Sequence, residues 1–277
     1  MPAHKKKAPH ADIHYEKGLI CTDCHTAEEV HGNGVMHETQ LEAVTVECED
    51  CHESQGKVIR EMSIGGRMTL CNMAVEMGAK IGYVEPDEKT VQWLAVRTNK
   101  KYEIVTSDAD ANFEKIIDCD ITKLEPQIAC PHTVDNVKPV SEVVGTRIDQ
   151  ALIGTCTNGR LEDLKIASEI LRGRKISNRV RLLVFPASME VFAQAMELGI
   201  LQELVKSGAV IMNPGCGPCL GAHEGVLAPG EVCLSTANRN FKGRMGCKEA
   251  EVYLASPATV AVSSLYGEIT DVRGDLK

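Results

Sequence analysis

The sequence lacks the features that would attach it to a membrane or to nucleic acid. No stretch approaches the roughly 18 consecutive apolar residues of a membrane span, and its start, MPAHKKKAPHADIHYEKG, has no apolar region behind its basic residues. Positive charge is not in excess, because 30 Lys and Arg stand against 39 Asp and Glu, for a net charge of −9. We therefore expect a cytoplasmic protein whose partners include no nucleic acid and no membrane.

Aromatic residues are also scarce, at 4%, whereas hydrophobic residues make up 43% of the 277, which is enough for one or two globular domains. Cysteine is the residue in excess, with 12 copies. In a reducing compartment, cysteines are metal ligands or buried thiols more often than disulfide partners. The positions of the cysteines therefore indicate where the chemistry of this chain lies.

Residues 1–57 are rich in His, Glu and Cys but have few apolar residues, so we expect a loop-rich segment with little core of its own. The pattern C-x-x-C-H occurs in it twice. This pattern attaches c-type haem through two thioethers and an adjacent iron-binding His. The segment thus resembles part of a multihaem cytochrome c. The residues of the two motifs are Cys21, Cys24, His25, Cys48, Cys51 and His52.

A second interpretation of these motifs stays open. The four cysteines also match a zinc ribbon, although the 23 residues between the two pairs are a long gap for that pattern. Haem is attached outside the cytoplasmic membrane and this chain shows no signal peptide, so we expect the motifs to be empty or filled with zinc. If haem were bound, its second axial ligands would come from His14, His31 and His37.

From about Arg60 onward, helical and strand patterns alternate. Apolar residues recur at helical spacing between shorter apolar runs that are bounded by Gly, Pro, Asn or Ser. Strands separated by helices predict an α/β fold with a largely parallel sheet. The expected strands are 81–84, 102–105, 150–154, 180–184, 209–212, 232–234 and 252–255; the expected helices are 67–80, one opening at 86–88, 161–171, 189–198, 201–207 and one after Pro257.

Several polar side chains come shortly after expected strands. They are Cys156, Cys216, Cys219, Asn238 and Arg239. In open α/β sheets the ligand crevice lies beyond the carboxyl ends of the strands, so these side chains should converge there. Thiols together with a guanidinium suggest a metal and an anion. The pair Cys216-x-x-Cys219 alone fits a redox dithiol, half a zinc site or part of an iron–sulfur site. With Cys156 there are three thiols, and a cubane held by three thiolates leaves one iron free as a Lewis acid.

The sequence around these residues resembles the aconitase superfamily, and most closely the large subunits of 3-isopropylmalate dehydratases. The resemblance covers about residues 58–277. It rests on six motifs in the family's order, which are RMTLCNMAVE at 67–76, CPHTVDN at 130–136, IGTCTNGR at 153–160, NPGCGPCLGA at 213–222, LSTANRNFKGRM at 234–245 and LASPAT at 254–259.

The resemblance implies a truncated, three-layer aconitase-like fold. An incomplete α/β part would span 58–147 and a cluster-binding α/β domain 148–277, after the segment 1–57. It implies a four-iron, four-sulfur cluster on Cys156, Cys216 and Cys219. The reaction would be the isomerisation of 2-isopropylmalate and 3-isopropylmalate by dehydration and rehydration, in leucine biosynthesis, or the related aconitase or homoaconitase reaction.

The resemblance also assigns roles to five further residues. Asn72 and Glu76, which share a helix face at i and i+4, would lie near the open iron. Asn238 would lie beside the cluster, and Arg239 and Arg244 would bind the carboxylates of a hydroxy-dicarboxylate, for which an Arg fork is suited. The implied protein partner is a small swivel subunit that carries the family's catalytic serine.

Simpler interpretations apply to other residues. Taken alone, Glu76 would be a solvated helix residue and Arg244 a surface charge, and His132 and His223 receive no role. Five further cysteines are expected to be buried thiols. They are Cys71, Cys119, Cys130, Cys233 and Cys247.

The chain also departs from the family pattern. A family large subunit is roughly twice as long, and its N-terminal half, which contributes Asp and His residues to the site, has no counterpart here. We interpret the sequence as a join between a multihaem-like segment and the C-terminal part of a dehydratase large subunit. For the isolated chain we expect little or no turnover, because missing acid and base groups cost orders of magnitude in rate.

Overall fold

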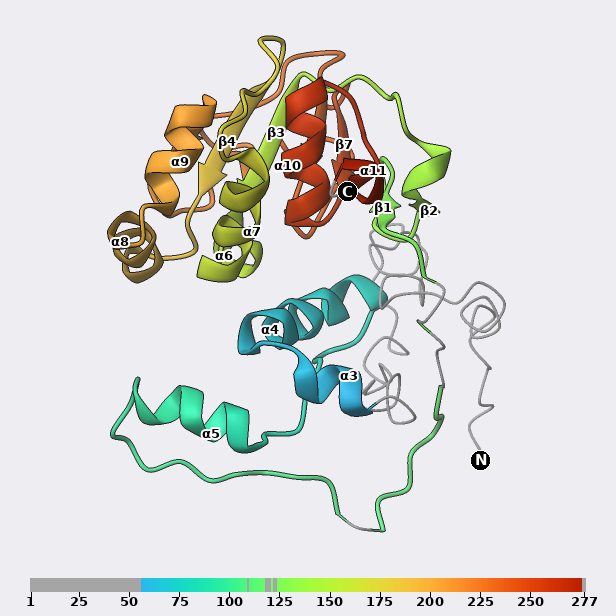
Figure 1. The fold of residues 1–277 in the computed structure, drawn as a ribbon. Helices are drawn as coiled ribbons and strands as arrows, with labels where there is room; N and C mark the ends of the chain where they lie inside the picture. The colour runs from blue at the N-terminus through green and yellow to red at the C-terminus, as the bar shows by residue number, and fades with distance from the viewer. Residues whose placement is uncertain (1–55, 109, 118–120, 122–123, 276–277) are drawn as a thin grey trace, which may run out of the picture. The chain divides into compact units, whose positions relative to one another are not determined.

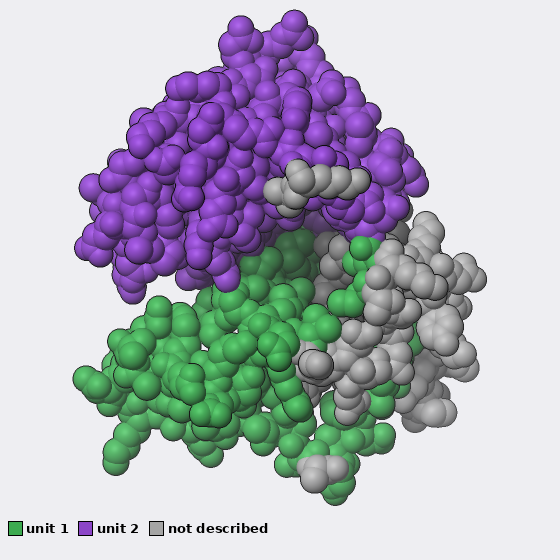
Figure 2. Space-filling model, viewed as in Figure 1, with its two compact units in different colours: residues 1–124 green, residues 125–277 purple. Residues whose placement is uncertain are grey.

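The computed structural model describes residues 56–108, 110–117, 121 and 124–275. The chain divides into two compact units, Met1–Leu124 and Glu125–Lys277 (Figure 2). The boundary that we expected at 147/148 falls inside the second unit, and the segment 1–55 lies outside the described residues. No helix in the described part of the chain is long and apolar enough to cross a bilayer.

The described part of the first unit contains four short helices (Figure 1). They are α3 (Gly56–Glu61), α4 (Ile64–Met73), the 3₁₀ helix η3 (Ala74–Met77) and α5 (Glu88–Ala95). Helix α4 begins where the Ser63 hydroxyl accepts a hydrogen bond from the Gly66 N–H at 3.0 Å, and η3 ends at Gly78 in the left-handed conformation (φ +79°). The helix expected at 67–80 is thus confirmed, displaced by three residues towards the N-terminus.

The strands expected at 81–84 and 102–105 were wrong. Tyr83 alone is a bridge residue, and 102–105 has no strand at all, with Tyr102 and Val105 exposed. A period-two apolar pattern forms a strand only where a second strand pairs with it, because an isolated strand leaves its backbone groups unpaired. The described part of this unit supplies no such pairing.

An ion pair with a buried guanidinium joins three of these helices. The Arg67 side chain is 5% exposed; its guanidinium donates to the Ile59 and Arg60 carbonyls at the end of α3 and to Asp87 at 2.6 Å. Asp87 is the N-cap of α5 and accepts the Thr90 N–H at 3.0 Å. The hydrogen bond from Arg67, opposed by partial burial and helped by the Thr90 N–H, lowers the pKa of Asp87 well below 3.8.

Asp87→Asn is therefore expected to destabilise the first unit by about 2 kcal/mol at pH 7. Because the folded-state pKa lies below the unfolded one, this contribution is present above about pH 4 and is lost as pH falls further. Unfolding in urea, followed by the fluorescence of Trp93 in α5, measures it at pH 7 and pH 3. The exposed Glu103 of the same unit provides the control, since Glu103→Gln should change little. An equal effect of Asp87→Asn at both pH values would contradict the prediction.

The second unit is an α/β layer structure around one seven-stranded sheet (Figure 1). The strand order is β2-β1-β7-β6-β3-β4-β5, in which the five strands from β7 to β5 are parallel and the β1–β2 hairpin joins antiparallel at the edge. The strands are β1 (Gln127–Ala129), β2 (Val137–Pro139), β3 (Gln150–Gly154), β4 (Arg181–Phe185), β5 (Val210–Ile211), β6 (Val232–Ser235) and β7 (Glu251–Leu254). The predicted α/β class with a largely parallel sheet is confirmed.

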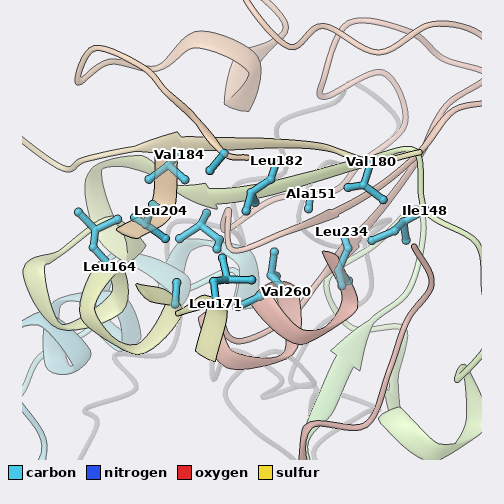
Figure 3. Packing of buried hydrophobic residues seen from close by; sticks show 14 of the residues in the cluster. Ile148, Ala151, Leu164, Leu171, Val180, Leu182, Val184, Leu204, Leu234 and Val260 are labelled. Carbon is cyan, nitrogen blue, oxygen red and sulfur yellow. The ribbon is translucent and has the colours of Figure 1, made fainter. Parts of the chain in front are cut away.

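Helices and one long connection cover the two faces of this sheet. The helices of the unit are η4 (Val140–Glu142), α6 (Thr155–Asn158), α7 (Leu161–Leu171), α8 (Met189–Glu197), α9 (Ile200–Ser207), η5 (Gly217–Leu220), α10 (Pro257–Tyr266) and α11 (Val272–Asp275). Figure 3 shows Leu164 and Leu171 of α7, Leu204 of α9 and Val260 of α10 beneath one face of the sheet. On this face they meet Leu182 and Val184 of β4, which lie in the same buried cluster.

The alternate residues of β4, Leu183 and Phe185, point to the other face. A Cβ added at Gly225 would lie 2.4 Å from Leu183, and one added at Gly217 would lie 2.9 Å from the Phe185 ring. The connection that contains η5 therefore packs directly on this face. It forms the third layer, and it carries two of the predicted cluster cysteines.

Candidate functional site

The predicted site residues of the second unit follow the carboxyl ends of its parallel strands. Cys156 lies in α6, directly after β3. Cys216 and Cys219 come after β5, Cys216 as the N-cap of η5 and Cys219 within it. Asn238 and Arg239 follow β6. Because β3, β5 and β6 run in the same direction within one sheet, these residues lie at the same edge.

The loop that carries Cys156 makes a tight turn against β4. Gly154 has a φ of +143° and Thr155 a φ of +84°, a backbone conformation that non-glycine residues seldom adopt. A Cβ at Gly154 would lie 2.3 Å from the Phe185 carbonyl oxygen, and a Cβ at Gly159 would lie 2.2 Å from the same atom. Close packing against Phe185 thus fixes the backbone on both sides of Cys156, whose side chain is exposed.

Hydrogen bonds join this loop to the loop that carries Asn238. The Asn238 Oδ1 accepts from the Thr157 hydroxyl at 2.7 Å and from the Asn158 amide at 3.1 Å. The Asn158 amide also donates to the Thr236 carbonyl at 2.6 Å, and the Thr236 hydroxyl accepts from the Gly154 N–H at 2.8 Å. Asn238 is buried, at 5% exposure. The network therefore holds its side chain in one orientation beside Cys156.

The two cysteines of the C-x-x-C motif lie at the η5 turn. The Cys219 N–H donates to the Cys216 carbonyl at 2.9 Å, Cys216 is exposed and Cys219 is half-buried. Gly217, between them, packs on the same Phe185 ring whose backbone touches Gly154. Phe185 is therefore the contact shared by the two cysteine-bearing loops. Sequence reasoning missed it, because nothing in the β4 pattern distinguishes it from an ordinary core residue.

Arg244 extends the site to a third loop. Its Nη2 lies 3.8 Å from the Cys219 Sγ, and its guanidinium carbon lies 5.2 Å from the centre of the Phe241 ring. Its Nε is buried without a hydrogen-bond partner. Arg239 is half-buried on the same connection. The structure thus brings Arg244 next to Cys219, one of the three predicted cluster ligands.

Asn72 and Glu76 belong to the first unit. Asn72 is half-buried in the last turn of α4, and Glu76 is 7% exposed in η3. The interpretation of Glu76 as a solvated helix residue was therefore wrong, because η3 packs this face of the helix inward.

The remaining cysteines divide into two groups. Cys130 and Cys233 are buried, and burial raises the pKa of Cys130 and raises that of Cys233 to about 12, which makes both inert thiols. Cys71 and Cys247 are only half-buried, so the expectation of full burial was wrong for them. Cys247 lies in the turn after Gly246 and contacts the Glu249 carboxylate at 3.0 Å. Cys119 lies outside the described residues.

In donor type, Cys156, Cys216 and Cys219 fit an iron–sulfur cluster. All three are free thiols at one sheet edge, and thiolates are the ligands that such clusters require. Among the described residues no three His, Cys, Asp or Glu side chains are already grouped so as to hold a metal ion. The backbone places the cysteine-bearing loops side by side, since both pack on Phe185.

A buried carboxyl caps the helix that follows Cys156. Asp163 accepts the Arg160 N–H at 2.9 Å in the first turn of α7, yet burial raises its pKa from 3.8 to about 6. The folded state therefore binds a proton at the Asp163 carboxyl more tightly than the unfolded state does. Stability should be greatest below about pH 4 and should fall as pH rises through 6.

Asp163→Asn keeps an oxygen acceptor for the Arg160 N–H and removes the charge. We expect it to abolish this decline and to stabilise the chain by no more than about 2 kcal/mol at pH 7. The free energy of unfolding, measured between pH 4 and 7, checks this. The exposed Glu197 gives the matched control, Glu197→Gln. A variant that is less stable than wild type across the whole range would show that the carboxylate is needed as a charged cap.

The second unit is therefore of the α/β class. Its candidate ligand site, made of thiols, amides and a guanidinium, lies at the carboxyl edge of a mostly parallel sheet. A model of the aconitase family (aconitate hydratase) matches residues 35–147 and 142–267. This match covers well over half of the chain, which therefore belongs to the aconitase family.

Several curated relatives are similar to this chain. One from Methanosarcina mazei, named "Probable methanogen homoaconitase large subunit", is 58% identical over 221 residues, which is 80% of this chain and 56% of the relative. The 3-isopropylmalate dehydratase large subunit 1 of Methanopyrus kandleri is 55% identical over 221 residues, 80% of this chain and 53% of its own. The methanogen homoaconitase large subunit of Methanocaldococcus jannaschii is 52% identical over 228 residues, 79% and 54% respectively. The chain spans about half the length of the curated relatives it matches.

The family match changes the interpretation of the first segment. It begins at residue 35, inside the range 1–57 that we assigned to a cytochrome-like sequence, and so includes Cys48, Cys51 and His52. The comparisons give the cytochrome resemblance no support. All six residues of the two C-x-x-C-H motifs lie outside the described residues.

Proposed function

We propose that the chain is the cluster-bearing component of a hydro-lyase that isomerises 2-isopropylmalate and 3-isopropylmalate by dehydration and rehydration. The single observation that supports this most is the convergence of Cys156, the Cys216–Cys219 turn and Arg244 at one sheet edge, in a chain of the aconitase family. The bound cluster would be held by the three thiolates and would supply a Lewis acid for the leaving hydroxyl.

The chain's own side chains would bind and orient the substrate. Arg244 and Arg239 would take its carboxylates, since a guanidinium donates two parallel hydrogen bonds to a carboxylate. Asn238, whose Oδ1 accepts from Thr157 and Asn158, would help to orient the substrate beside the cluster. Glu76 and Asn72 are the further residues to which the family resemblance assigns a catalytic role.

A small subunit completes the proposal. The relatives are named as large subunits, which supports a partner that carries the remaining catalytic groups. We expect little turnover without it, because each positioned acid or base contributes about 10²–10⁴-fold to the rate.

Homoaconitase is the second candidate, because three of the similar relatives carry that name. The two substrates share the malate core and differ in the side chain. Anaerobic reconstitution with iron and sulfide, addition of a small subunit, and assay with 2-isopropylmalate and homocitrate in parallel separate the candidates. Turnover of isopropylmalate alone supports the first candidate. Turnover of homocitrate alone replaces it with the second, and a reconstituted complex that turns over neither substrate overturns both.

A further inference from the structure

The turn that carries Arg244 is fixed at both ends. The Arg244 N–H donates to the Phe241 carbonyl at 2.9 Å, and Gly243 allows this turn with a φ of +83°. Beyond it, Met245 is 1% exposed and its carbonyl accepts the Leu227 N–H at 3.1 Å. The backbone therefore places the side chains of Phe241 and Arg244 close to each other.

The guanidinium of Arg244 has an aromatic neighbour where a carboxylate would be usual. In the part of the chain that the structure describes, no carboxylate lies within 4.0 Å of it, and its contacts are the Phe241 ring and the Cys219 sulfur. Its Nε is buried and unpaired. A partly buried guanidinium without a carboxylate partner is unfavourable unless an anion completes it.

The aromatic contact leaves the hydrogen-bonding edge of the guanidinium open. A ring holds a guanidinium through its π face, whereas a protein carboxylate would occupy the N–H groups that a ligand needs. Phe241 itself is 39% exposed, in contrast to Phe185 at 2%, so burial in the core does not explain the position of its ring.

We propose that Phe241 is a positioning residue for Arg244. Its ring fixes the plane of the guanidinium beside Cys219 without occupying an N–H group, so that the Nη groups can bind one carboxylate of the hydroxy-dicarboxylate. The assignment rests on the proposed function for the identity of that anion. The stack itself is independent of it.

The affinity of the reconstituted chain for 2-isopropylmalate, measured by calorimetry, tests the role. Phe241→Leu keeps an apolar side chain but removes the π face, and we expect a five- to tenfold weaker Kd with unchanged iron content. Phe241→Tyr restores the π face and should bind within about twofold of wild type. Trp93→Leu is the control, because it removes a closer stack, the 4.1 Å contact with Arg97 in the other unit. It should leave the Kd unchanged.

The arginine Nε–Hε signals in NMR spectra report the stack directly. The signal of Arg244, assigned by its loss in Arg244→Lys, should show a ring-current shift in wild type and Phe241→Tyr that disappears in Phe241→Leu. Absence of the shift in wild type overturns the proposal. A shift accompanied by wild-type affinity in Phe241→Leu also overturns it, because the stack would then exist without a role. If the shift is present but the wild-type chain binds no isopropylmalate, the proposed function fails, and the carboxylate role of this pair fails with it.

Discussion

Serine substitution of Cys156, Cys216 or Cys219 is expected to remove most of the iron that the chain binds after anaerobic reconstitution. The wild-type chain should take up about four irons, and the triple variant close to none, because a serine hydroxyl stays protonated where a thiolate would ligate iron. Iron and sulfide analysis and the visible absorption of the cluster measure the loss. Enzymatic activity should fall at least a hundredfold with it, by about the contribution of a metal Lewis acid.

Cys247→Ser is the matched control for this series. Cys247 is a free, half-buried thiol on the same connection as Arg244, but its contact is the Glu249 carboxylate. Its replacement should leave iron content unchanged. If the triple variant binds as much iron as wild type, the three cysteines are not the ligands, and the C-x-x-C-H motifs at 21–25 and 48–52 become the next set to replace.

The location of this site was largely predictable from the sequence. Strands β3 and β6 are apolar runs bounded by Gly, Ser and Thr, and helix α7 was expected at the bounds that the structure gives it, 161–171. Once strands and helices alternate, the parallel direction follows, and with it the edge at which Cys156 and Asn238 meet. The hydrogen bond between Thr157 and Asn238, 81 positions apart, follows from the same topology.

Other features had no local signal. The β1–β2 hairpin has strands of three residues each, too short for a period-two pattern to emerge, and β2 ends in a proline. The expected strand at 102–105 had the pattern but no partner, so propensity alone misplaced it. Phe185 acts through contacts of its backbone with Gly154 and Gly159 and of its ring with Gly217, and Phe241 acts through the contact of its ring with Arg244. Such contacts appear only when the loops are placed in space.

The glycines around Cys156 carry the second large prediction. At Gly159 an alanine Cβ would lie 2.2 Å from the Phe185 carbonyl oxygen and 2.7 Å from the Thr155 carbonyl oxygen, both backbone atoms. The same backbone is held by the Ala187 N–H, which donates to the Gly159 carbonyl at 2.8 Å. Neither the Gly159 loop nor the end of β4 can move away from the added methyl group without breaking backbone hydrogen bonds of this kind. Gly159→Ala should therefore destabilise the second unit by about 3 kcal/mol. Its melting temperature should fall by about 10 °C.

Three further alanine substitutions separate the steric cost from the conformational one. Gly274 has no neighbour within 4 Å and no positive φ, so Gly274→Ala should melt with wild type. Gly173 has a φ of +72° and open space, so Gly173→Ala should cost about 1 kcal/mol through backbone conformation alone. Gly154 combines a φ of +143° with a 2.3 Å approach to the Phe185 carbonyl oxygen, and Gly154→Ala should be the most damaging of the four.

The order of the four variants therefore tests the packing of the cysteine-bearing loop against β4. Thermal unfolding followed by circular dichroism gives the melting temperature of each variant. The fluorescence of the sole tryptophan, Trp93, should show separately that the first unit is unaffected. If Gly159→Ala melts together with Gly274→Ala, the loop does not pack on the Phe185 backbone in solution. Phe185 would then not be the contact that joins the two cysteine-bearing loops. Loss of stability in Gly159→Ala together with a loss of bound iron would connect this packing to the cluster site.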